Sequence, residues 1–356
     1  MTRNRYSSRS VRLCDDFAQT CQFLAKLPVV QKKTPEQDRN VHFFTHDGEL
    51  FLELIYRRVG VIACIASGVD FEVSGMIPRI GKSVLGFIRN STHIRIRGQR
   101  LEFCSSEQSY KITMSSATLD RWVVPAECPG AKPLIGSLAR RLMAVVNDGL
   151  RSRLAVDFDT FGFFFIDGWY IFMTLPAEYG ENLAVIDPDF LRVTSSLDEA
   201  DRVMGLAGRR VVSASGSVEV VCPVIECKRP SIESYIDRLA KEEGLYQLPS
   251  DLYFNLSSSF PGGDGYIGIT AEGEALYKSE QAGRCTIFLG ATPLTAALSQ
   301  SGVEMARRVF RGSGSLTLEQ SRTVAIFRDS ESVFALANCE FDKVFGGMTS
   351  GRGKPN

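Results

Sequence analysis

The pattern that decides the fold lies in residues 70–114, which read DFEVSGMIPRIGKSVLGFIRNSTHIRIRGQRLEFCSSEQSYKITM. A strand-like stretch runs into Ile77-Pro78 and then into a helical segment over 79–90. Alternation of apolar and polar residues predicts three strands after it, at 93–97, 101–104 and 110–114. The order strand, helix, three strands defines a unit that can be sought in the rest of the chain.

The same order returns twice, at a period of roughly 105 to 110 residues. The second occurrence has a strand at 183–186, a helix from Pro188 to Thr194, and strands near 202–206, 210–214 and 218–222. The third has a strand at 285–289, a helix from Pro293 to Ser299, and strands near 315–318, 323–327 and 333–337. Asp187 and Thr292 are good N-cap residues, and a proline at the next position loses no helical hydrogen bond.

Each unit also opens with a helix and a hairpin. The predicted opening helices cover 17–27, 134–145 and 232–239. The predicted hairpins pair 41–44 with 50–55 around Asp47-Gly48, 161–166 with 170–174 around Asp167-Gly168, and 252–256 with 266–270 around 261–265. Three such units, joined at 124–132 and 222–231, indicate an α+β fold in which antiparallel sheet dominates and two helices per unit cover one face.

Length and composition narrow the function. The 356 residues are 44% hydrophobic, and 41 basic residues balance 41 acidic ones, which excludes a uniformly basic nucleic-acid coat and an acidic disordered chain. The nine cysteines are scattered and never spaced as CxxC, which argues against a disulfide framework and a thiolate zinc site and favours a reducing cytoplasm. The longest apolar runs are too short for a transmembrane helix. The basic segment 1–14 is interpreted as a mobile arm rather than a transit peptide.

Positive charge is concentrated locally. Residues 73–101 contain six basic residues and no acid. On the predicted helix, Arg79, Lys82 and Arg89 share one face, opposite to an apolar face. The opening helices add Lys26, Arg140, Arg141, Arg238 and Lys241. Such stripes suit a phosphate backbone, although any single stripe also fits a solvated helix face. The second helix of the third unit is expected to carry no basic residue.

The sequence contains no convincing catalytic constellation, and neither a cofactor nor a metal is expected. Gly81-Lys82-Ser83 follows a strand and opens a helix, as in a P-loop, but Met76 stands where that motif requires glycine. The stretch 198–201 spells DEAD without the buried strand that should precede it. His42 and His46 lie in an alternating stretch typical of a strand surface.

Taken together, the modules resemble the processivity sliding clamps of the bacterial DNA polymerase III beta-subunit type, over roughly residues 12–342. Local similarities lie at 71–114, at Leu119-Asp120-Arg121-Trp122, and at Arg229-Pro230 followed by Tyr235. The resemblance implies clamp domains at 1–125, 126–230 and 231–345, with a flexible Gly-rich basic tail at 346–356. It also implies a head-to-tail homodimer ring with helices around a central hole and sheets outside.

In that family the ring encircles duplex DNA without sequence preference, tethers a DNA polymerase, needs a clamp-loader ATPase and catalyses nothing itself. The implied DNA-facing residues are Lys26, Arg79, Lys82, Arg89, Arg140, Arg141, Arg192, Arg238 and Lys241. The implied partner-peptide groove comprises Leu154, Pro230, Tyr235, Ala337 and Cys339. Core packing is the alternative role for Leu154 and Tyr235.

The family's Thr-Asp-Gly-His-Arg-Leu stretch and its short hydrophobic C-terminus are absent from this sequence. These departures indicate a divergent clamp, of the kind that a phage or mobile element would encode, acting in the cytoplasm of a bacterial or phage-infected cell. Two alternatives remain open: a non-encircling DNA-binding accessory subunit of a polymerase, and a P-loop nucleic-acid-dependent ATPase.

Overall fold

A computed structural model describes most of the chain. The described residues are 9–27, 30, 40–77, 80–115, 131–133, 136–146, 153–157, 162–166, 169–174, 182–197, 202–228, 244–260, 265–279, 283–288 and 294–346.

Within the described residues the same order of elements occurs three times: strand, helix, four strands, helix, three strands. Repeat 1 consists of β1 (Arg9–Arg12), α1 (Phe17–Lys26), β2 (Val41–His46), β3 (Glu49–Tyr56), β4 (Val59–Ser67), β5 (Ser74–Ile77), α2 (Lys82–Ile88), β6 (His93–Arg97), β7 (Arg100–Cys104) and β8 (Ser109–Thr113).

Repeat 2 consists of β9 (Lys132–Pro133), α3 (Gly136–Val146), β10 (Arg153–Asp157), β11 (Gly162–Ile166), β12 (Tyr170–Thr174), β13 (Asn182–Ile186), α4 (Pro188–Thr194), β14 (Val203–Ala207), β15 (Arg210–Ser215) and β16 (Val218–Pro223). After β17 (Ile225–Lys228), repeat 3 consists of β18 (Tyr246–Leu248), α6 (Leu252–Ser259), β19 (Tyr266–Ile269), β20 (Glu274–Ser279), β21 (Gly283–Phe288), β22 (Ala296–Ser299), α7 (Gln300–Val309), β23 (Thr317–Gln320), β24 (Val324–Arg328) and β25 (Ser332–Ala337). The short helix α8 (Phe341–Phe345) follows.

The strands of each repeat form two four-stranded groups with the same internal order. One group runs β1-β6-β7-β8, β9-β14-β15-β16 or β18-β23-β24-β25, and the other runs β5-β2-β3-β4, β13-β10-β11-β12 or β22-β19-β20-β21. Two joints fuse groups from neighbouring repeats, because β4 pairs with β16 and β12 pairs with β25. The joints produce an eight-stranded and a nine-stranded sheet, and both joints are antiparallel.

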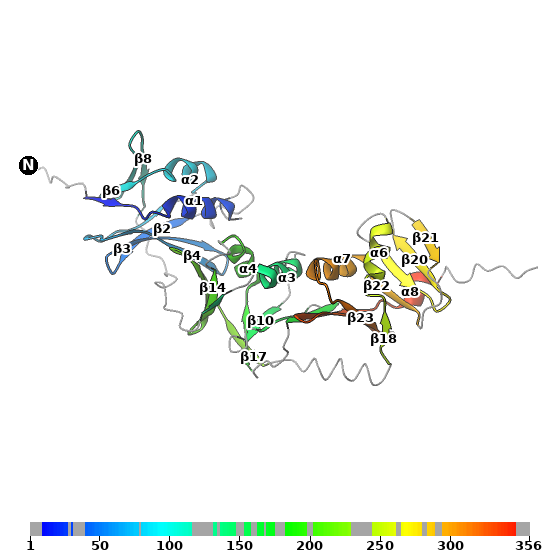
Figure 1. The fold of residues 1–356 in the computed structure, drawn as a ribbon. Helices are drawn as coiled ribbons and strands as arrows, with labels where there is room; N and C mark the ends of the chain where they lie inside the picture. The colour runs from blue at the N-terminus through cyan, green and yellow to red at the C-terminus, as the bar shows by residue number, and fades with distance from the viewer. Residues whose placement is uncertain are drawn as a thin grey trace, which may run out of the picture. The chain divides into compact units, whose positions relative to one another are not determined.

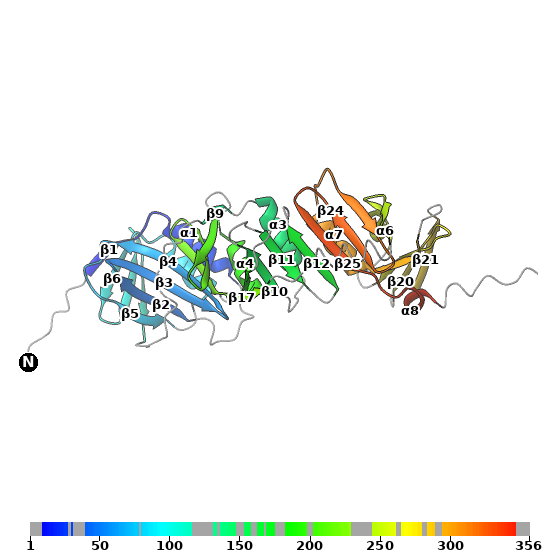
Figure 2. The same cartoon turned by 90° about the horizontal axis from the view of Figure 1, so that it is seen from below.

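The contacts divide the chain into two compact units. Unit 1 comprises Met1–Ala139 and Ile186–Ile225, and unit 2 comprises Arg140–Val185 and Glu226–Asn356. Within unit 1, α1 and α4 lie on the same side of the eight-stranded sheet; within unit 2, α3 and α7 lie on one side of the nine-stranded sheet (Figures 1 and 2). Repeat 2 contributes strands to both units.

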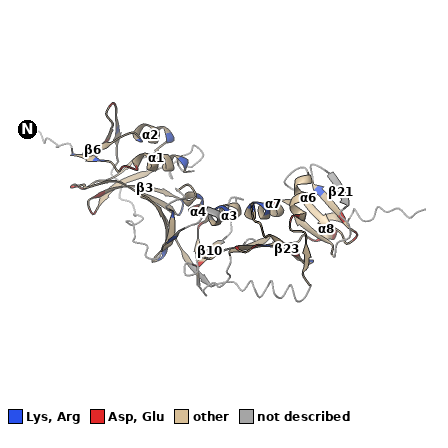
Figure 3. Cartoon of the chain, viewed as in Figure 1, with Lys and Arg blue, Asp and Glu red and all other residues tan. Residues whose placement is uncertain are grey.

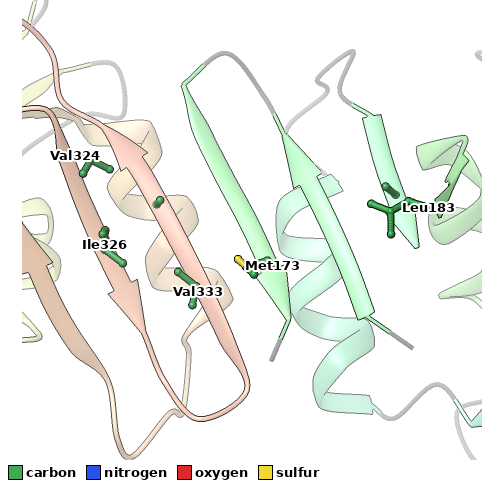
Figure 4. Close-up of a cluster of buried hydrophobic side chains, with 7 residues drawn as sticks. Met173, Leu183, Val324, Ile326 and Val333 are labelled. Carbon is green, nitrogen blue, oxygen red and sulfur yellow. The ribbon is translucent and has the colours of Figure 1, made fainter. Parts of the chain in front are cut away.

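Apolar packing explains why the elements assemble inside each unit. In unit 1 the Phe17 ring of α1 stacks on Phe103 of β7 at 5.9 Å between centroids, and Phe43 of β2 meets Phe103 edge-on at 6.2 Å. In unit 2 a buried cluster crosses the joint between β12 and β25 (Figure 4). It contains Met173 and Leu183 from repeat 2 with Val324, Ile326 and Val333 from repeat 3. Each joint is therefore continuous in backbone pairing and in hydrophobic core.

Most sequence predictions for repeats 1 and 2 are confirmed, including the α+β class. β6 occupies the predicted residues, and Asp47 and Gly48 have φ values of 47° and 76° in the turn between β2 and β3. Asp187 caps α4, because its carboxylate accepts a hydrogen bond from the Asp189 amide at 2.9 Å. The predicted helix at 232–239 and the turn at Asp167-Gly168 lie outside the described residues.

Two predictions for repeat 3 are wrong. Residues 252–256 form the start of α6, not a strand, because Tyr253 and Leu256 are buried at helical spacing. The helix expected to end at Ser299 begins after it: residues 296–299 form β22, and the Ser299 hydroxyl caps α7 by accepting a hydrogen bond from the Gly302 amide at 3.3 Å.

The joint between β4 and β16 contains a carboxyl group with a perturbed pKa. Glu219 lies opposite Ile62, and its Oε2 atom is buried without a hydrogen-bond partner among the described residues. Burial disfavours the carboxylate and raises the pKa of Glu219 from 4.5 to about 7. Between these two pKa values Glu219 is protonated in the folded state and ionised in the unfolded state. The free energy of unfolding therefore falls as pH rises through this window.

We expect Glu219→Gln to remove this pH dependence, since the amide does not ionise. Urea unfolding at about pH 5 and about pH 7.5 measures it, with a wild-type slope of at most about 1.4 kcal/mol per pH unit. Parallel pH profiles for wild type and Glu219→Gln would contradict the assignment.

Candidate nucleic-acid interface and partner surfaces

Four of the predicted DNA-facing residues are exposed on or directly after the helices: Lys26, Lys82, Arg89 and Arg140. Lys82 is the first residue of α2, Arg89 directly follows this helix, and Arg140 lies on α3. None of the last three has a hydrogen-bond or ion-pair partner among the described residues. A cation in the first turn of a helix is unfavourable beside the positive end of the helix dipole, and the first turn of α2 contains no acid. Lys82 therefore does not stabilise its own helix.

Lys26 lies in the last turn of α1, where the helix dipole favours a cation. It lines a hollow of about 590 Å³ between α1 and the end of α4, with Gln19, Gln22, Ser196 and Ser215 among the other lining residues. These side chains are of the kind that donate hydrogen bonds to phosphates. The basic residues of α1 and α2 are visible as blue segments in Figure 3.

Arg141 occupies a different environment from Arg140. Its guanidinium is 12% exposed and forms ion pairs with Asp329 at 2.8 Å and Glu331 at 3.1 Å. It also hydrogen-bonds to the Ser332 hydroxyl. Asp329 and its neighbours lie on the turn between β24 and β25, so these contacts connect α3 of repeat 2 to repeat 3 within unit 2. Arg141 is thus engaged in holding a joint.

Removal of the Arg141 guanidinium by Arg141→Met is expected to lower the free energy of unfolding by about 3 kcal/mol, because it leaves the Asp329 charge buried without its partner. Burial alone would raise the pKa of Asp329, but hydrogen bonds from Glu331, Ser313, Arg141 and Ser332 lower it below its ordinary value. A lowered carboxyl pKa stabilises above the unfolded value of 3.8, and this contribution is lost as pH falls. Denaturant unfolding should therefore give a large difference at neutral pH and a smaller one below about pH 4. An equal difference at both pH values would contradict this role.

Arg192 is also bound locally. Its Nη1 atom lies 2.7 Å from Asp189, whose side chain is 5% exposed. Arg57, from the turn between β3 and β4, reaches the same carboxylate at 2.6 Å. The shared carboxylate connects repeat 1 to α4 of repeat 2, so Arg192 helps to hold the first joint.

Five sequence-predicted site residues lie outside the described residues, namely Arg79, Arg238, Lys241, Pro230 and Tyr235. The corrected position of α7 reveals two basic residues that the sequence analysis missed. Arg307 and Arg308 are exposed in the last turn of α7, close to Glu304 of the same helix. The Ser299 cap, followed by apolar residues at 303, 306 and 309, is the signal that would have located them.

The predicted groove residues are not equivalent in the structure. Leu154 is completely buried in the sheet core, as expected for packing. Cys339 forms an isolated antiparallel β-bridge with Ala297, and its side chain is partly buried against Leu276 and Phe345. It therefore belongs to the packing around the sheet β21-β20-β19-β22. Ala337 is half-buried, and its amide donates a hydrogen bond to the Trp169 carbonyl at 2.8 Å.

Trp169 is the second feature that the sequence analysis missed. Its side chain is 66% exposed, next to the joint between β12 and β25. A large exposed indole beside a sheet joint is typical of a protein-binding surface.

Two of the strands that end their sheets, β8 and β21, are equivalent to the strands that form the joints. The joints pair β4 with β16 and β12 with β25. In repeat 1 the strand equivalent to β16 and β25 is β8, and in repeat 3 the strand equivalent to β4 and β12 is β21. Both end their sheets without a partner among the described strands. Beside β8, the Phe87 side chain of α2 is 64% exposed and stacks on Tyr110 at 5.8 Å between centroids. An open strand edge flanked by an exposed aromatic pair is suited to pairing with another chain.

The described residues contain no helix long and apolar enough to cross a membrane and no group of three or more side chains suited to hold a metal ion. Antiparallel pairing throughout the described sheets also differs from the strand–loop–helix context of a P-loop in a parallel sheet.

The architecture is that of the DNA clamp fold. Over 94% of its length the chain is similar to the Helicobacter pylori beta clamp bound to a DNA ligase peptide, with a TM-score of 0.63, 13% identity and 99% of that chain covered. It is similar over the same share to the DNA polymerase III beta subunits of Pseudomonas aeruginosa (TM-score 0.66, 12% identity, 100% covered) and Thermotoga maritima (TM-score 0.63, 14% identity, 99% covered). The sequence matches no family model and no curated protein. Repeat order and sheet pairing are thus shared with these clamps although few residues are.

Proposed function

We propose that the protein is a sliding clamp: two chains close head to tail into a ring that encircles duplex DNA and tethers a DNA polymerase. The observation that carries this proposal is the pair of internal joints. At each joint two sheet groups meet through their last strands. The group that ends in β4 pairs with the group of repeat 2 that ends in β16, and the group that ends in β12 pairs with the group of repeat 3 that ends in β25. The same rule applied to β8 and β21 pairs one chain with the next.

The exposed Phe87, which stacks on the half-buried Tyr110 of β8, supports this intermolecular joint, because both existing joints combine backbone pairing with buried apolar side chains. Pairing at both ends of each chain gives a closed two-fold assembly. The boundaries 1–125, 126–230 and 231–345, with the tail 346–356, are the domains proposed for this ring.

DNA would be held through its phosphates by Lys26, Lys82, Arg89 and Arg140, with Arg307 and Arg308 as additional contacts. Arg79, Arg238 and Lys241 remain predicted contacts. Such contacts have no base specificity and weaken with salt, as sliding requires. The role is topological and non-catalytic, so a loader ATPase would open the ring. A bacterial or phage-infected cytoplasm is the proposed location.

The solution mass tests the ring directly. A two-chain ring has a mass of about 79 kDa, twice the 39.3 kDa of one chain. Light scattering at several concentrations should give the larger value. A strict monomer would favour the alternative function, a non-encircling accessory subunit of a polymerase.

Partner peptides would bind beside the joint of β12 and β25, where Trp169 and Ala337 meet. We expect Trp169→Ala to weaken binding of the DNA ligase peptide used with the H. pylori clamp at least ten-fold, by about 1.5–3 kcal/mol, since exposed indoles dominate such interfaces. Fluorescence anisotropy of the labelled peptide measures this effect. Phe87→Ala is the matched control, because it removes an equally exposed aromatic ring that belongs to unit 1, whereas Trp169 belongs to unit 2. Equal affinities for wild type and Trp169→Ala would remove Trp169 from the groove.

A further inference from the structure

The sheet group β1-β6-β7-β8 has one face that is basic and exposed. Its buried face contains Ile94, Ile96, Leu101 and Phe103, which alternate with the exposed residues. The register places Arg95 opposite Glu102 and Glu102 opposite Lys111, and it places Arg97 opposite Arg100. Residues opposite each other share a face, so four cations surround one carboxylate on the outer side of this sheet. We call Arg95, Arg97, Arg100 and Lys111 the β6–β8 basic face.

Local interactions do not account for this charge. Arg95, Arg97 and Arg100 are exposed, and the described residues offer them no hydrogen-bond or ion-pair partner. Like charges directly opposite on neighbouring strands, as in Arg97 and Arg100, destabilise a sheet. Lys111 lies 3.5 Å from Glu102, the one acid in the row. Neutral residues at 97 and 100 would therefore make the hairpin more stable, whereas Arg95 and Lys111 both lie opposite Glu102 and attract it.

The other two repeats show that the fold does not require cations here. The row Arg95-Glu102-Lys111 corresponds to Gly205-Val212-Val221 in repeat 2 and to Glu319-Ile326-Ala335 in repeat 3. Val212, Val221, Ile326 and Ala335 are buried. An end sheet that is merely solvated would have mixed signs, whereas this one has four cations and one acid.

A hollow of about 470 Å³ adjoins the β6–β8 basic face. Its lining includes Arg95, His93, Asn90, Thr92, Ser10 and Ser105. Hydroxyl and amide side chains next to arginine are the groups that contact phosphate oxygens in nucleic-acid complexes. Phe, Tyr and Trp are absent from this face among the described residues of β6, β7 and β8, so the imidazole of His93 is the one ring there that could stack on a base.

We propose that the β6–β8 basic face binds the phosphodiester backbone of nucleic acid outside any central hole. Exposed arginines at alternate strand positions lie about 6.8 Å apart, and neighbouring strands lie about 4.8 Å apart, so a row of phosphates can meet several cations at once. An acidic protein segment is disfavoured because arginine and neutral donors together match phosphate oxygens better than isolated carboxylates. The face lies on the side of the sheet opposite Phe103, which packs against α1, so it is distinct from the helix surface discussed above. Lys111 lies on β8, whose edge is the proposed joint between chains, whereas Arg95, Arg97 and Arg100 lie on the two strands behind it.

The test uses DNA that cannot thread through a ring. A short duplex and a short oligothymidylate, each labelled with a fluorophore and capped at both ends with streptavidin before protein is added, are titrated with the full chain over a series of salt concentrations. The variant is Arg97→Gln with Arg100→Gln. The matched control is Arg209→Gln with Arg210→Gln, which removes the same charge from the equivalent hairpin of repeat 2.

Wild type should bind capped DNA, and the variant should lower the slope of log affinity against log salt by about 1.8 for the duplex or about 1.4 for the single strand. The form of DNA, duplex or single strand, whose affinity falls more in the variant is the preferred ligand of this face. Thermal unfolding should show the variant to be at least as stable as wild type, because the substitutions remove two positive charges that face each other on neighbouring strands.

Three results would overturn the proposal: no binding of capped DNA by wild type, equal losses in the variant and in the control, or competition by polyglutamate as effective as that by unlabelled DNA. Light scattering of the Arg97→Gln, Arg100→Gln protein should give the wild-type mass, so that loss of binding to capped DNA is separated from loss of the ring. The failure of this inference therefore differs from failure of the clamp function.

Discussion

Phe87→Asp should convert a dimer of about 79 kDa into a monomer of 39.3 kDa. Phe87 is 64% exposed within one chain and stacks on Tyr110 of the open strand β8. In the proposed ring it packs against the partner chain, and burial of a large apolar side chain contributes about 1.5–3 kcal/mol. An aspartate there would lose this contribution and add the cost of a desolvated charge, so dimer affinity should fall more than 100-fold. Sedimentation or light scattering over a dilution series measures this change.

Trp169→Asp is the matched control, because it introduces the same charge at an aromatic residue of similar exposure, 66%. It should leave the mass unchanged and abolish peptide binding. The two variants thus separate ring closure from partner binding. A Phe87→Asp protein that stays dimeric, or a Trp169→Asp protein that dissociates, would contradict the proposed use of the β8 edge.

Combined replacement of Lys82, Arg89 and Arg140 by alanine should reduce DNA retention more than ten-fold at physiological salt. These side chains are exposed and unpaired among the described residues, so their loss should not affect folding. Each phosphate contact removed should lower the salt slope by about 0.9 on duplex DNA. Filter binding of a long duplex across a salt series measures the slope and the affinity together.

The control for this variant removes three arginines at the ends of hairpins: Arg209, Arg210 and Arg322. It has the same net charge as the test variant, so a general effect of charge would appear in both. A salt slope unchanged by replacement of Lys82, Arg89 and Arg140 would exclude these residues from DNA contact.

The strand β6 of repeat 1 was predictable because burial alternates strictly along it. Ile94 and Ile96 are buried between exposed neighbours, so the period of two is present in the sequence itself. Asp187 before Pro188 marked the start of α4, since a carboxylate cap and a preset φ act locally. Short-range physical signals of this kind need no knowledge of the tertiary structure.

Residues 252–256 of repeat 3 were wrongly predicted as a strand, because their apolar residues fit both the strand period of two and the helical period of 3.6. Leu252, Phe254 and Leu256 suggest a strand, but Tyr253 and Leu256 are the buried pair, and helical packing prevails. The Thr292-Pro293 signal predicts a helix that ends at Ser299, the residue that caps the start of α7 in the structure. The misplaced helix concealed Arg307 and Arg308.

The roles of individual arginines were not predictable from sequence. Arg140 and Arg141 are adjacent on α3, yet Arg140 is exposed and Arg141 is bound to Asp329, 188 residues away along the chain. Helical periodicity distributes residues around a helix but does not identify distant partners. The open edges β8 and β21 likewise became apparent only from the strand order.

Retention on end-capped DNA tests the central claim, that the protein encircles its substrate, most directly. A linear duplex with biotin at both ends is incubated with the protein, capped with streptavidin either before or after this step, and washed with high salt to remove electrostatic contacts. A ring that has threaded over a free end should be retained only on duplex capped afterwards, and it should be lost from uncapped duplex and from duplex capped beforehand. Equal retention on all three forms of DNA, or loss from all three, would contradict encirclement.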